Sequence, residues 1–335
     1  MSASDPSPGA PGGARRAARL GITTDQRRIL YAVVSAVLLF VVGGLIRPGF
    51  SSPSGIAAVL TVACFVGLVA AGQTFVILIG GIDLSVPWTL NAAAILMMST
   101  AASSDARTPF ALLVTLGMGA AVGPCNGVGI ALFGVPAVVM TLAMNGILEG
   151  LTLGLSGGLT CPSCAAYAPP VLQAAAHGDF LGVPVILYLW AVVIVVATFV
   201  LSFTTFGRCT YAIGNNVRAS YLAGVNVTRT TIILYVMSGI FAALAGIMIL
   251  GFGGQASLGL GEPYLFQSIA AAVIGGVYIA GGRGHYVGAV AGSVSLVALV
   301  SVLMAMNMPE YGRSITYGVI ILLLLLLYGR EKPEQ

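Results

Sequence analysis

Two carboxylates, Asp83 and Glu149, lie within apolar stretches of this 335-residue chain. Ionisable side chains inside a membrane span are costly, and they usually serve a function. Asp83 follows Gly80-Gly81 and precedes a new apolar run, so the glycine pair should break the preceding helix. The carboxylate of Asp83 can then cap the next helix by accepting backbone N–H bonds, or it can face a solute path. We favour the cap.

Polar side chains form a stripe around Glu149. Five of them are spaced 4, 4, 3 and 4 residues apart, which puts them on one face of a single helix. Such a stripe can line a water-filled path for a solute, or it can join helices through hydrogen bonds. The candidate path residues, in the stripe and on neighbouring segments, are Gln73, Thr74, Asp83, Asn91, Thr141, Asn145, Glu149, Thr152 and Ser156.

The residue types exclude several kinds of chemistry. The single lysine, Lys332, lies near the C-terminus, so no G-x-x-x-x-G-K-[ST] phosphate-binding loop exists. His177 and His285 leave no zinc-type spacing, and we predict no metal and no cofactor. Residues 154–157, Gly-Leu-Ser-Gly, match a pattern of intramembrane proteases, but neither histidine is placed to serve that serine. Without these motifs an enzyme is not expected. The +4 net charge is spread along the chain, so a nucleic-acid partner is not expected either.

Membrane helices are the elements that must hold these residues. Apolar residues make up 58% of the chain and charged residues only 7%, whereas soluble domains carry about 25% charged residues. One span needs about 20 apolar residues. The apolar runs therefore predict an all-α integral membrane protein with about ten transmembrane helices. They lie near residues 29–46, 56–79, 84–101, 109–133, 135–155, 181–203, 229–252, 264–280, 286–307 and 313–328.

The positive charges predict the orientation of these helices. With a cytoplasmic N-terminus, 11 Lys and Arg residues lie inside and 3 outside, as the positive-inside rule requires. An even number of spans then leaves both termini in the cytoplasm. Residues 1–28, rich in Ser, Pro, Gly and Ala, are predicted to be a disordered tail. Residues 29–330 would form the transmembrane domain and residues 331–335 a second tail.

Two loops are unusually long for a membrane protein of this size. The outer loop, residues 156–180, contains Cys161-Pro-Ser-Cys164, for which a local disulfide is favoured over free thiols. The inner loop, residues 204–228, mixes aromatic, small and basic residues and predicts one or two short surface helices. Its small apolar side chains, rimmed by Arg208 and Arg218, can dock another protein. They can equally pack on the chain's own helices.

Three segments resemble permease subunits of sugar-importing ABC transporters of the ribose, xylose and arabinose type. Residues 205–226, TFGRCTYAIGNNVRASYLAGVN, are similar to the cytoplasmic coupling region of that family. Residues 72–85, GQTFVILIGGIDLS, and residues 269–284, IAAAVIGGVYIAGGRG, are similar to two further family motifs and follow in the same order. The helix count agrees with this family as well.

The resemblance implies a multi-pass permease of the bacterial inner membrane that forms the path for a monosaccharide or related polyol. Its partners would be a second permease chain, two cytoplasmic ATP-binding subunits, a periplasmic substrate-binding protein and membrane lipid. ATP would be bound by the partner subunits, which fits the missing phosphate loop. The residues that match the ATPase-coupling region are Phe206, Gly207, Arg208, Tyr211, Ala212, Ile213, Gly214, Asn216, Arg218, Ala219 and Gly224.

Two other functions stay open. A secondary transporter driven by protons or sodium would use Asp83 and Glu149 as coupling carboxylates and would need no ATPase partner. An ABC permease for branched-chain amino acids or nucleosides would share the fold and a related coupling loop. Pro87-Trp88 departs from the sugar family's usual glycine and bears on the choice of substrate.

Glycine patterns predict how the helices pack. The four-residue spacings at Gly119, Gly123 and Gly127, and again at Gly284, Gly288 and Gly292, permit close approach of helices. The stretches 73–81 and 267–276 both begin with a glutamine and end with Ile-Gly-Gly. This weak likeness raises the possibility of an internal repeat.

Overall fold

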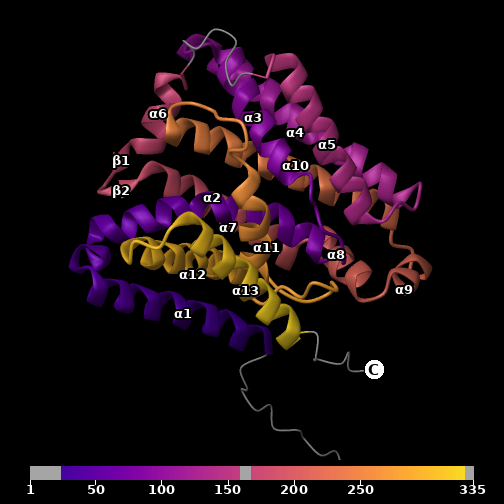
Figure 1. The fold of residues 1–335 in the computed structure, drawn as a ribbon. Coiled ribbons are helices and arrows are strands. Elements are labelled where there is room, and N and C mark those ends of the chain that lie inside the picture. The colour runs from indigo at the N-terminus through magenta and orange to yellow at the C-terminus, as the bar shows by residue number, and fades with distance from the viewer. Residues whose placement is uncertain (1–23, 159–166, 329–335) are drawn as a thin grey trace, which may run out of the picture.

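Residues 24–158 and 167–328 are described by a computed structural model, and most of them are helical. Figure 1 shows the long helices running between two ends, with α8 and α9 at one end and the β1–β2 hairpin at the other. The elements are α1 (Thr24–Ile46), η1 (Pro48–Ser51), α2 (Pro53–Ile77), α3 (Val86–Ala101), η2 (Asp105–Arg107), α4 (Thr108–Ala131), α5 (Ala137–Ser156), α6 (Pro170–His177), β1 (Asp179–Phe180), β2 (Val183–Pro184), α7 (Val185–Phe203), α8 (Thr205–Asn215), α9 (Val217–Leu222), α10 (Val227–Gly253), α11 (Glu262–Ile274), α12 (Tyr286–Ala305) and α13 (Glu310–Tyr328).

Seven of the described helices are long and apolar enough to cross a membrane, namely α1, α2, α4, α5, α7, α10 and α12. The expected count of about ten spans is therefore not confirmed. Two of the expected spans, α3 and α11, have only 16 and 13 residues, fewer than the ~20 that a full crossing needs. Each follows an irregular segment. Residues 78–85, which include Gly80-Gly81, precede α3, and residues 254–261 precede α11.

The N-terminal boundary also differs from the expectation. Helix α1 begins at Thr24, and the side chain of Arg28 is buried, so residues 24–28 are part of the helix rather than a disordered tail. The backbone of Gly276 lies against the Arg28 side chain, which leaves no space there for a Cβ atom. The remainder of the predicted tail, like residues 329–335, lies outside the described residues.

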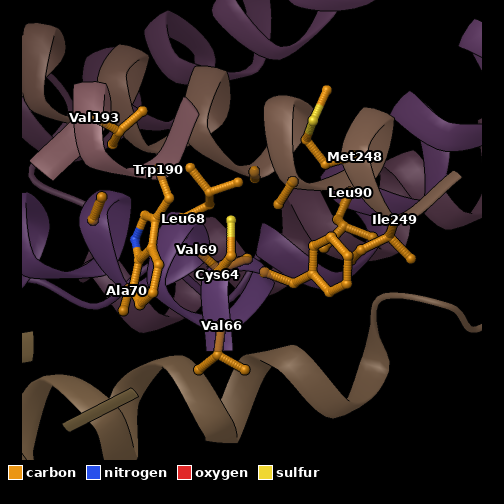
Figure 2. Packing of buried hydrophobic residues seen from close by; sticks show 14 of the residues in the cluster. Cys64, Val66, Leu68, Val69, Ala70, Leu90, Trp190, Val193, Met248 and Ile249 are labelled. Atoms are coloured by element: carbon orange, nitrogen blue, oxygen red, sulfur yellow. The ribbon is translucent and has the colours of Figure 1, made fainter. Parts of the chain in front are cut away.

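Helix α2 occupies the centre of the fold. Every residue from Ala63 to Leu78 is buried, as expected for a helix that is apolar on all sides. Figure 2 shows the packing around Cys64, with Trp190 of α7 on one side. The indole of Trp190 donates to the Tyr286 hydroxyl at 3.2 Å, and that hydroxyl donates to the Gly67 carbonyl at 2.8 Å. These bonds tie α7 and α12 to α2.

Helices α4 and α10 pack closely through glycines. A Cβ atom at Gly119 would lie 2.6 Å from Ala243 Cβ, and one at Gly127 would lie 2.6 Å from Ile232 Cα. At Gly123 a Cβ atom would collide with the backbone of α10. The second glycine series packs in the same way, since Gly288 and Gly292 of α12 lie against the end of α11. Both series were predicted to permit close approach of helices, and this is confirmed except for Gly284, which precedes α12 and has a φ of 120°.

Two halves of the chain repeat the same order of elements. A long helix, an eight-residue irregular segment, a shorter helix and two long helices occur as α2 to α5 and again as α10 to α13. Each shorter helix carries proline at its second position, Pro87 in α3 and Pro263 in α11. The Phe65 ring of α2 meets the Phe252 ring of α10, whereas Gly72 lies against Ser238 earlier in α10, so the two series begin with helices that run in opposite directions. The predicted match of residues 73–81 with 267–276 is wrong, because it pairs a long helix with a short one.

The outer loop folds against the end of α10. Backbone bonds join Ala168 N to Gly254 O at 2.8 Å, and the His177 ring lies 2.9 Å from the Phe252 carbonyl oxygen through Nε2. The β1–β2 hairpin pairs Phe180 with Val183 and leads into α7. Cys161 and Cys164 lie outside the described residues, so their disulfide stays a prediction.

Candidate functional site

A buried polar network surrounds Asp83, between the end of α2 and the start of α3. The side chain of Asp83 is 1% exposed. One carboxylate oxygen accepts from the Ser85 backbone N–H at 3.0 Å and from the Ser85 hydroxyl at 2.5 Å. The other accepts from the Ser238 hydroxyl of α10 at 2.7 Å. These hydrogen-bond partners are all neutral, and multiple donors are what a buried carboxylate requires.

Two amide side chains extend this network to neighbouring helices. The Gln73 side chain of α2 donates to the Asp83 carbonyl at 2.7 Å and accepts from the Asp83 N–H at 3.3 Å. Asn126 of α4 donates to the Ser85 hydroxyl at 2.9 Å. The network therefore joins α2, α4 and α10 to the segment that begins α3.

The predicted role of Asp83 as the N-cap of α3 is wrong. Ser85 is the N-cap residue, and its own side chain makes no capping bond. Asp83 lies two residues earlier and accepts the Ser85 N–H, which stabilises the turn before the helix. The predicted break of the preceding helix at the glycine pair is confirmed, since α2 ends at Ile77 and Gly80 adopts a φ of 78°.

The stripe on α5 faces α3 and α4. At its N-terminal end, the Thr141 hydroxyl lies 3.3 Å from the Ile82 carbonyl, and the side-chain oxygen of Asn145 accepts from the Trp88 N–H at 3.3 Å. At its C-terminal end, Thr152 and Ser156 line a largely apolar cavity of about 240 Å³ between α3, α4 and α5. The stripe thus joins helices at one end and lines a cavity at the other.

The remaining path candidates take different places. Glu149 is half-buried on α5, between the two ends of the stripe. Asn91 of α3, with its amide turned to satisfy both groups, donates to Ser257 O at 2.8 Å and accepts from Gly259 N at 3.3 Å. Thr74 is buried in α2 and its hydroxyl bonds the Ala70 carbonyl of its own helix. Thr74 neither lines the cavity nor belongs to the Asp83 network.

The inner loop forms two short helices, as the sequence predicted. Thr204 caps α8 by accepting from Gly207 N at 3.2 Å, and Asn216 caps α9 by accepting from Ala219 N at 2.9 Å. Capping side chains of this kind begin helices because the first backbone N–H groups otherwise lack partners. The sequence therefore encodes the separation into two helices at Asn216.

Helix α8 packs directly on two irregular segments of the membrane domain. A Cβ atom at Gly214 would collide with the Leu78 carbonyl and the Gly282 backbone. The Tyr211 hydroxyl donates to the Gly284 carbonyl at 2.6 Å, and it lies 3.2 Å from His285 Nδ1. This contact fixes α8 against the end of α2 and the segment before α12.

A comparison of the sequence with known proteins identifies the family. Residues 55–325 match the family described as branched-chain amino acid transport system, permease component. The chain belongs to this family of ABC importer permeases. The family resemblance inferred from the three motifs is therefore confirmed. The comparison with solved structures found no match.

Relatives of the permease match it along nearly its whole length. The ribose import permease protein RbsC of Bacillus subtilis is 32% identical over 314 residues, which cover 91% of this chain and 97% of the relative. RbsC of Haemophilus influenzae is 30% identical over 296 residues, which cover 88% of this chain and 90% of the relative. The autoinducer 2 import system permease protein LsrC of Escherichia coli is 31% identical over 306 residues, which cover 91% of this chain and 88% of the relative.

The permease exposes only part of the patch predicted on its inner loop. Ile213 is buried and Gly214 is packed, so these two residues hold α8 in place instead of lying on the surface. Apolar side chains are exposed further along, with Tyr221 at 71% and Leu222 at 78%. Arg208 and Arg218 are exposed as well. The predicted loop divides into a packed half and an exposed half.

Sequence reasoning missed several residues of the Asp83 network. Ser85 belongs to the quoted motif but was not among the candidates, while Asn126 and Ser238 lie in apolar helices far along the chain. The buried Tyr235 hydroxyl and the Asn126 carbonyl oxygen lack hydrogen-bond partners among the described residues. An asparagine among the glycines of α4 was the one available signal, because a buried amide needs polar partners.

Proposed function

We propose that this chain is the membrane-spanning permease subunit of an ATP-driven importer for a monosaccharide or related polyol. The observation that carries the proposal is the match to two ribose import permeases over about nine-tenths of each chain. The LsrC relative, named for autoinducer 2, shows that similar permeases serve other small solutes. A periplasmic substrate-binding protein would deliver the solute.

The α3–α5 face supports the proposed path. Thr152 and Ser156 line the cavity beside α5, and Glu149 and Asn145 continue the stripe toward the inner end. These residues offer scattered hydrogen-bond partners, which suits passage better than tight binding. The opposite face of α5 is apolar and exposed, which suits contact with membrane lipid and with a second permease chain, identical or related. Gln73 and Asp83 would support this path from behind, since both are fully engaged by the chain itself.

The α8–α9 unit supports the proposed coupling. It combines a packed half, held at Gly214 and Tyr211, with an exposed half that carries Tyr221, Leu222 and Arg218. Exposed apolar side chains next to basic ones are typical of a protein-docking surface. Two ATP-binding subunits would dock there from the cytoplasm, and they would supply the ATP site for which this chain has no phosphate loop.

The proposed location is the bacterial inner membrane with both termini in the cytoplasm. The 11 to 3 distribution of positive charges supports this orientation. The α8–α9 unit then lies inside, and the β1–β2 hairpin at the opposite end lies outside (Figure 1). In this arrangement α3 and α11, together with α13, would complete ten membrane-embedded helices.

Uptake by proteoliposomes tests the proposal. The chain, its co-purifying ATP-binding subunits and its binding protein are reconstituted, and pentoses, hexoses, polyols and leucine are offered in turn. We expect uptake of a sugar or polyol that requires the binding protein and is blocked by vanadate. Uptake of leucine alone would assign the permease to the amino-acid importers of its family. Uptake by the purified chain without ATP, abolished by a protonophore, would make it a secondary transporter.

A further inference from the structure

Residues 78–88 touch two regions to which the sequence assigned different tasks. At one end, the Leu78 carbonyl accepts from Gly282 N at 2.8 Å and lies against Gly214 of α8. At the other end, the Ile82 carbonyl lies 3.3 Å from the Thr141 hydroxyl of α5. The Trp88 N–H donates to Asn145 of the same helix at 3.3 Å. One short segment thus joins the predicted coupling helix to the predicted path helix.

We propose that residues 78–88 transmit the movement of α8 to α3 and α5, and that Asp83 is the residue that positions this link. The proposal rests on the proposed function, because it needs ATP-binding subunits that act on α8. It assigns to Asp83 a task different from contact with the solute, since the carboxylate is fully buried and both of its oxygens are bonded within the chain.

The contact at the α8 end is too close to admit another atom. Gly214 lies so close to the Leu78 carbonyl that a single added methyl group would collide with it. On the far side, a Cβ atom at Gly281 would lie 2.8 Å from Gly80 N and 3.0 Å from Leu78 O. Backbone therefore touches backbone on both sides of this turn. Because close-packed atoms transmit displacement, a shift of α8 must move the Leu78 carbonyl or break this packing.

The middle of the segment is held mainly by side chains. The last turn of α2 bonds Gly81 N to Val76 O at 3.0 Å, and the helical bonds of α3 resume with Thr89 N to Ser85 O at 2.9 Å. Between these points, Gln73 binds both backbone groups of Asp83. Such a segment can move as a unit when its side-chain partners move with it.

Asp83 connects this unit to the closely packed helices α2 and α10. Ser238 lies in α10 at the level where Gly72 of α2 approaches, since a Cβ atom at Gly72 would lie 2.9 Å from Ser238 Cα. The bond from Ser238 to Asp83 therefore anchors the link on the closely packed α2–α4–α10 group. Loss of that anchor should let the segment yield when α8 moves, so that ATP hydrolysis no longer drives α5.

Ser238→Ala and Asp83→Ala test this in the reconstituted complex. The measured quantity is solute taken up per ATP hydrolysed, with association of the ATP-binding subunit recorded by co-purification. We expect both variants to bind that subunit and hydrolyse ATP, while most of the uptake per ATP is lost. Asp83→Asn should restore most of the coupling, because its amide oxygen still accepts from Ser85 and its NH2 group can donate to the Ser238 hydroxyl.

Ser293→Ala is the matched control. Ser293 is equally buried, but its hydroxyl bonds only the Ala289 carbonyl of its own helix at 2.8 Å. The proposal is overturned if Ser238→Ala and Asp83→Ala retain the uptake per ATP of Ser293→Ala. If Asp83→Ala fails to assemble, Ser238→Ala decides alone, since it removes one hydroxyl and leaves the segment itself unchanged.

A second measurement needs no variant. Hydrogen exchange of residues 78–88 in the wild-type complex should differ between the nucleotide-free and vanadate-trapped states, and unchanged exchange would contradict the proposed movement. Failure of the proposed function would look different, because the wild-type complex would then show no vanadate-sensitive uptake of any solute.

Discussion

At the scale of single residues, a polar side chain takes its role from what lies next to it. Asp83 and Glu149 are both carboxylates in apolar surroundings, yet Asp83 accepts hydrogen bonds from two serines whereas Glu149 is half-buried on the polar stripe of α5. The sequence identifies both as costly, and therefore as candidates for function. Only their neighbours separate a positioning residue from a candidate for contact with the solute.

Glu149→Gln tests contact with the solute. If Glu149 lines the path, the variant should change the rate of uptake or the range of solutes while the thermal unfolding temperature in detergent stays the same. The side chain keeps its size and loses only its charge, so packing is preserved. Unchanged uptake of every solute that the wild type accepts would show that Glu149 does not contact the solute and serves in helix packing.

Gly214→Ala tests the packing of α8. Because the new methyl group would collide with the Leu78 carbonyl and the Gly282 backbone, we expect loss of uptake with the chain still inserted in the membrane. Gly253→Ala at the end of α10 is the control, since a Cβ atom there meets no atom within 4 Å. Equal uptake by the two variants would show that α8 can shift without consequence.

At the scale of elements, glycine decides which helices touch most closely. The α4–α10 pair places backbone against backbone at Gly123, so its stability depends on the absence of a side chain. The same helices carry Asn126 and Ser238 into the Asp83 network. Close packing and polar positioning are thus features of a single helix pair.

Gly123→Ala tests this packing. The added methyl group must separate α4 from α10, and overpacking of this kind costs about 1–3 kcal/mol. We therefore expect a lower unfolding temperature in detergent. Gly117→Ala in the same helix is the control, because a Cβ atom there meets no atom within 4 Å and alanine favours helix by up to about 1 kcal/mol. A Gly123→Ala protein as stable as Gly117→Ala would refute the close approach.

At the scale of the whole molecule, the two ends have different surfaces. The end with α8 and α9 exposes Tyr221, Leu222 and Arg218, whereas the opposite end carries the β1–β2 hairpin with Phe180 and Leu181 exposed. A permease that couples an outer binding protein to inner ATP-binding subunits needs such separate surfaces. The orientation predicted from the positive charges would place the α8–α9 end in the cytoplasm.

Cysteine labelling tests this orientation. In a variant without native cysteines, Leu181→Cys should react with a membrane-impermeant maleimide in intact spheroplasts, and Arg218→Cys should react only after the membrane is permeabilised. Both side chains are exposed, so differences in burial would not mask the result. The reverse labelling pattern would invert the proposed topology.

Arg218→Glu tests the docking surface. Reversal of this exposed charge should weaken association with the ATP-binding subunit and reduce uptake, while membrane insertion and the unfolding temperature stay the same. Arg229→Glu is the matched control, because Arg229 is also exposed on the inner side but begins α10 and lies outside the α8–α9 unit. Equal effects of the two substitutions would indicate a general response to charge instead of a docking site.

The sequence by itself determined the class of protein, the family and the order of the elements. Low charge and long apolar runs require lipid around the chain, and the three motifs identified the permease family before any contact was known. Capping residues such as Thr204 and Asn216 also encode local boundaries, because their hydrogen bonds join neighbours in sequence.

The tertiary structure decided where helices stop and which polar groups meet. The apolar run predicted as a span over 264–280 did not disclose that α11 ends at Ile274 after only 13 residues, and nothing local linked Asp83 to Ser238, 155 residues away. In a helix that is apolar on all sides, no periodic pattern tells which face is buried. Contacts between distant segments, such as Gly214 against Leu78, depend on the packing of the whole chain, and so does the choice between a residue that meets the solute and one that positions the path.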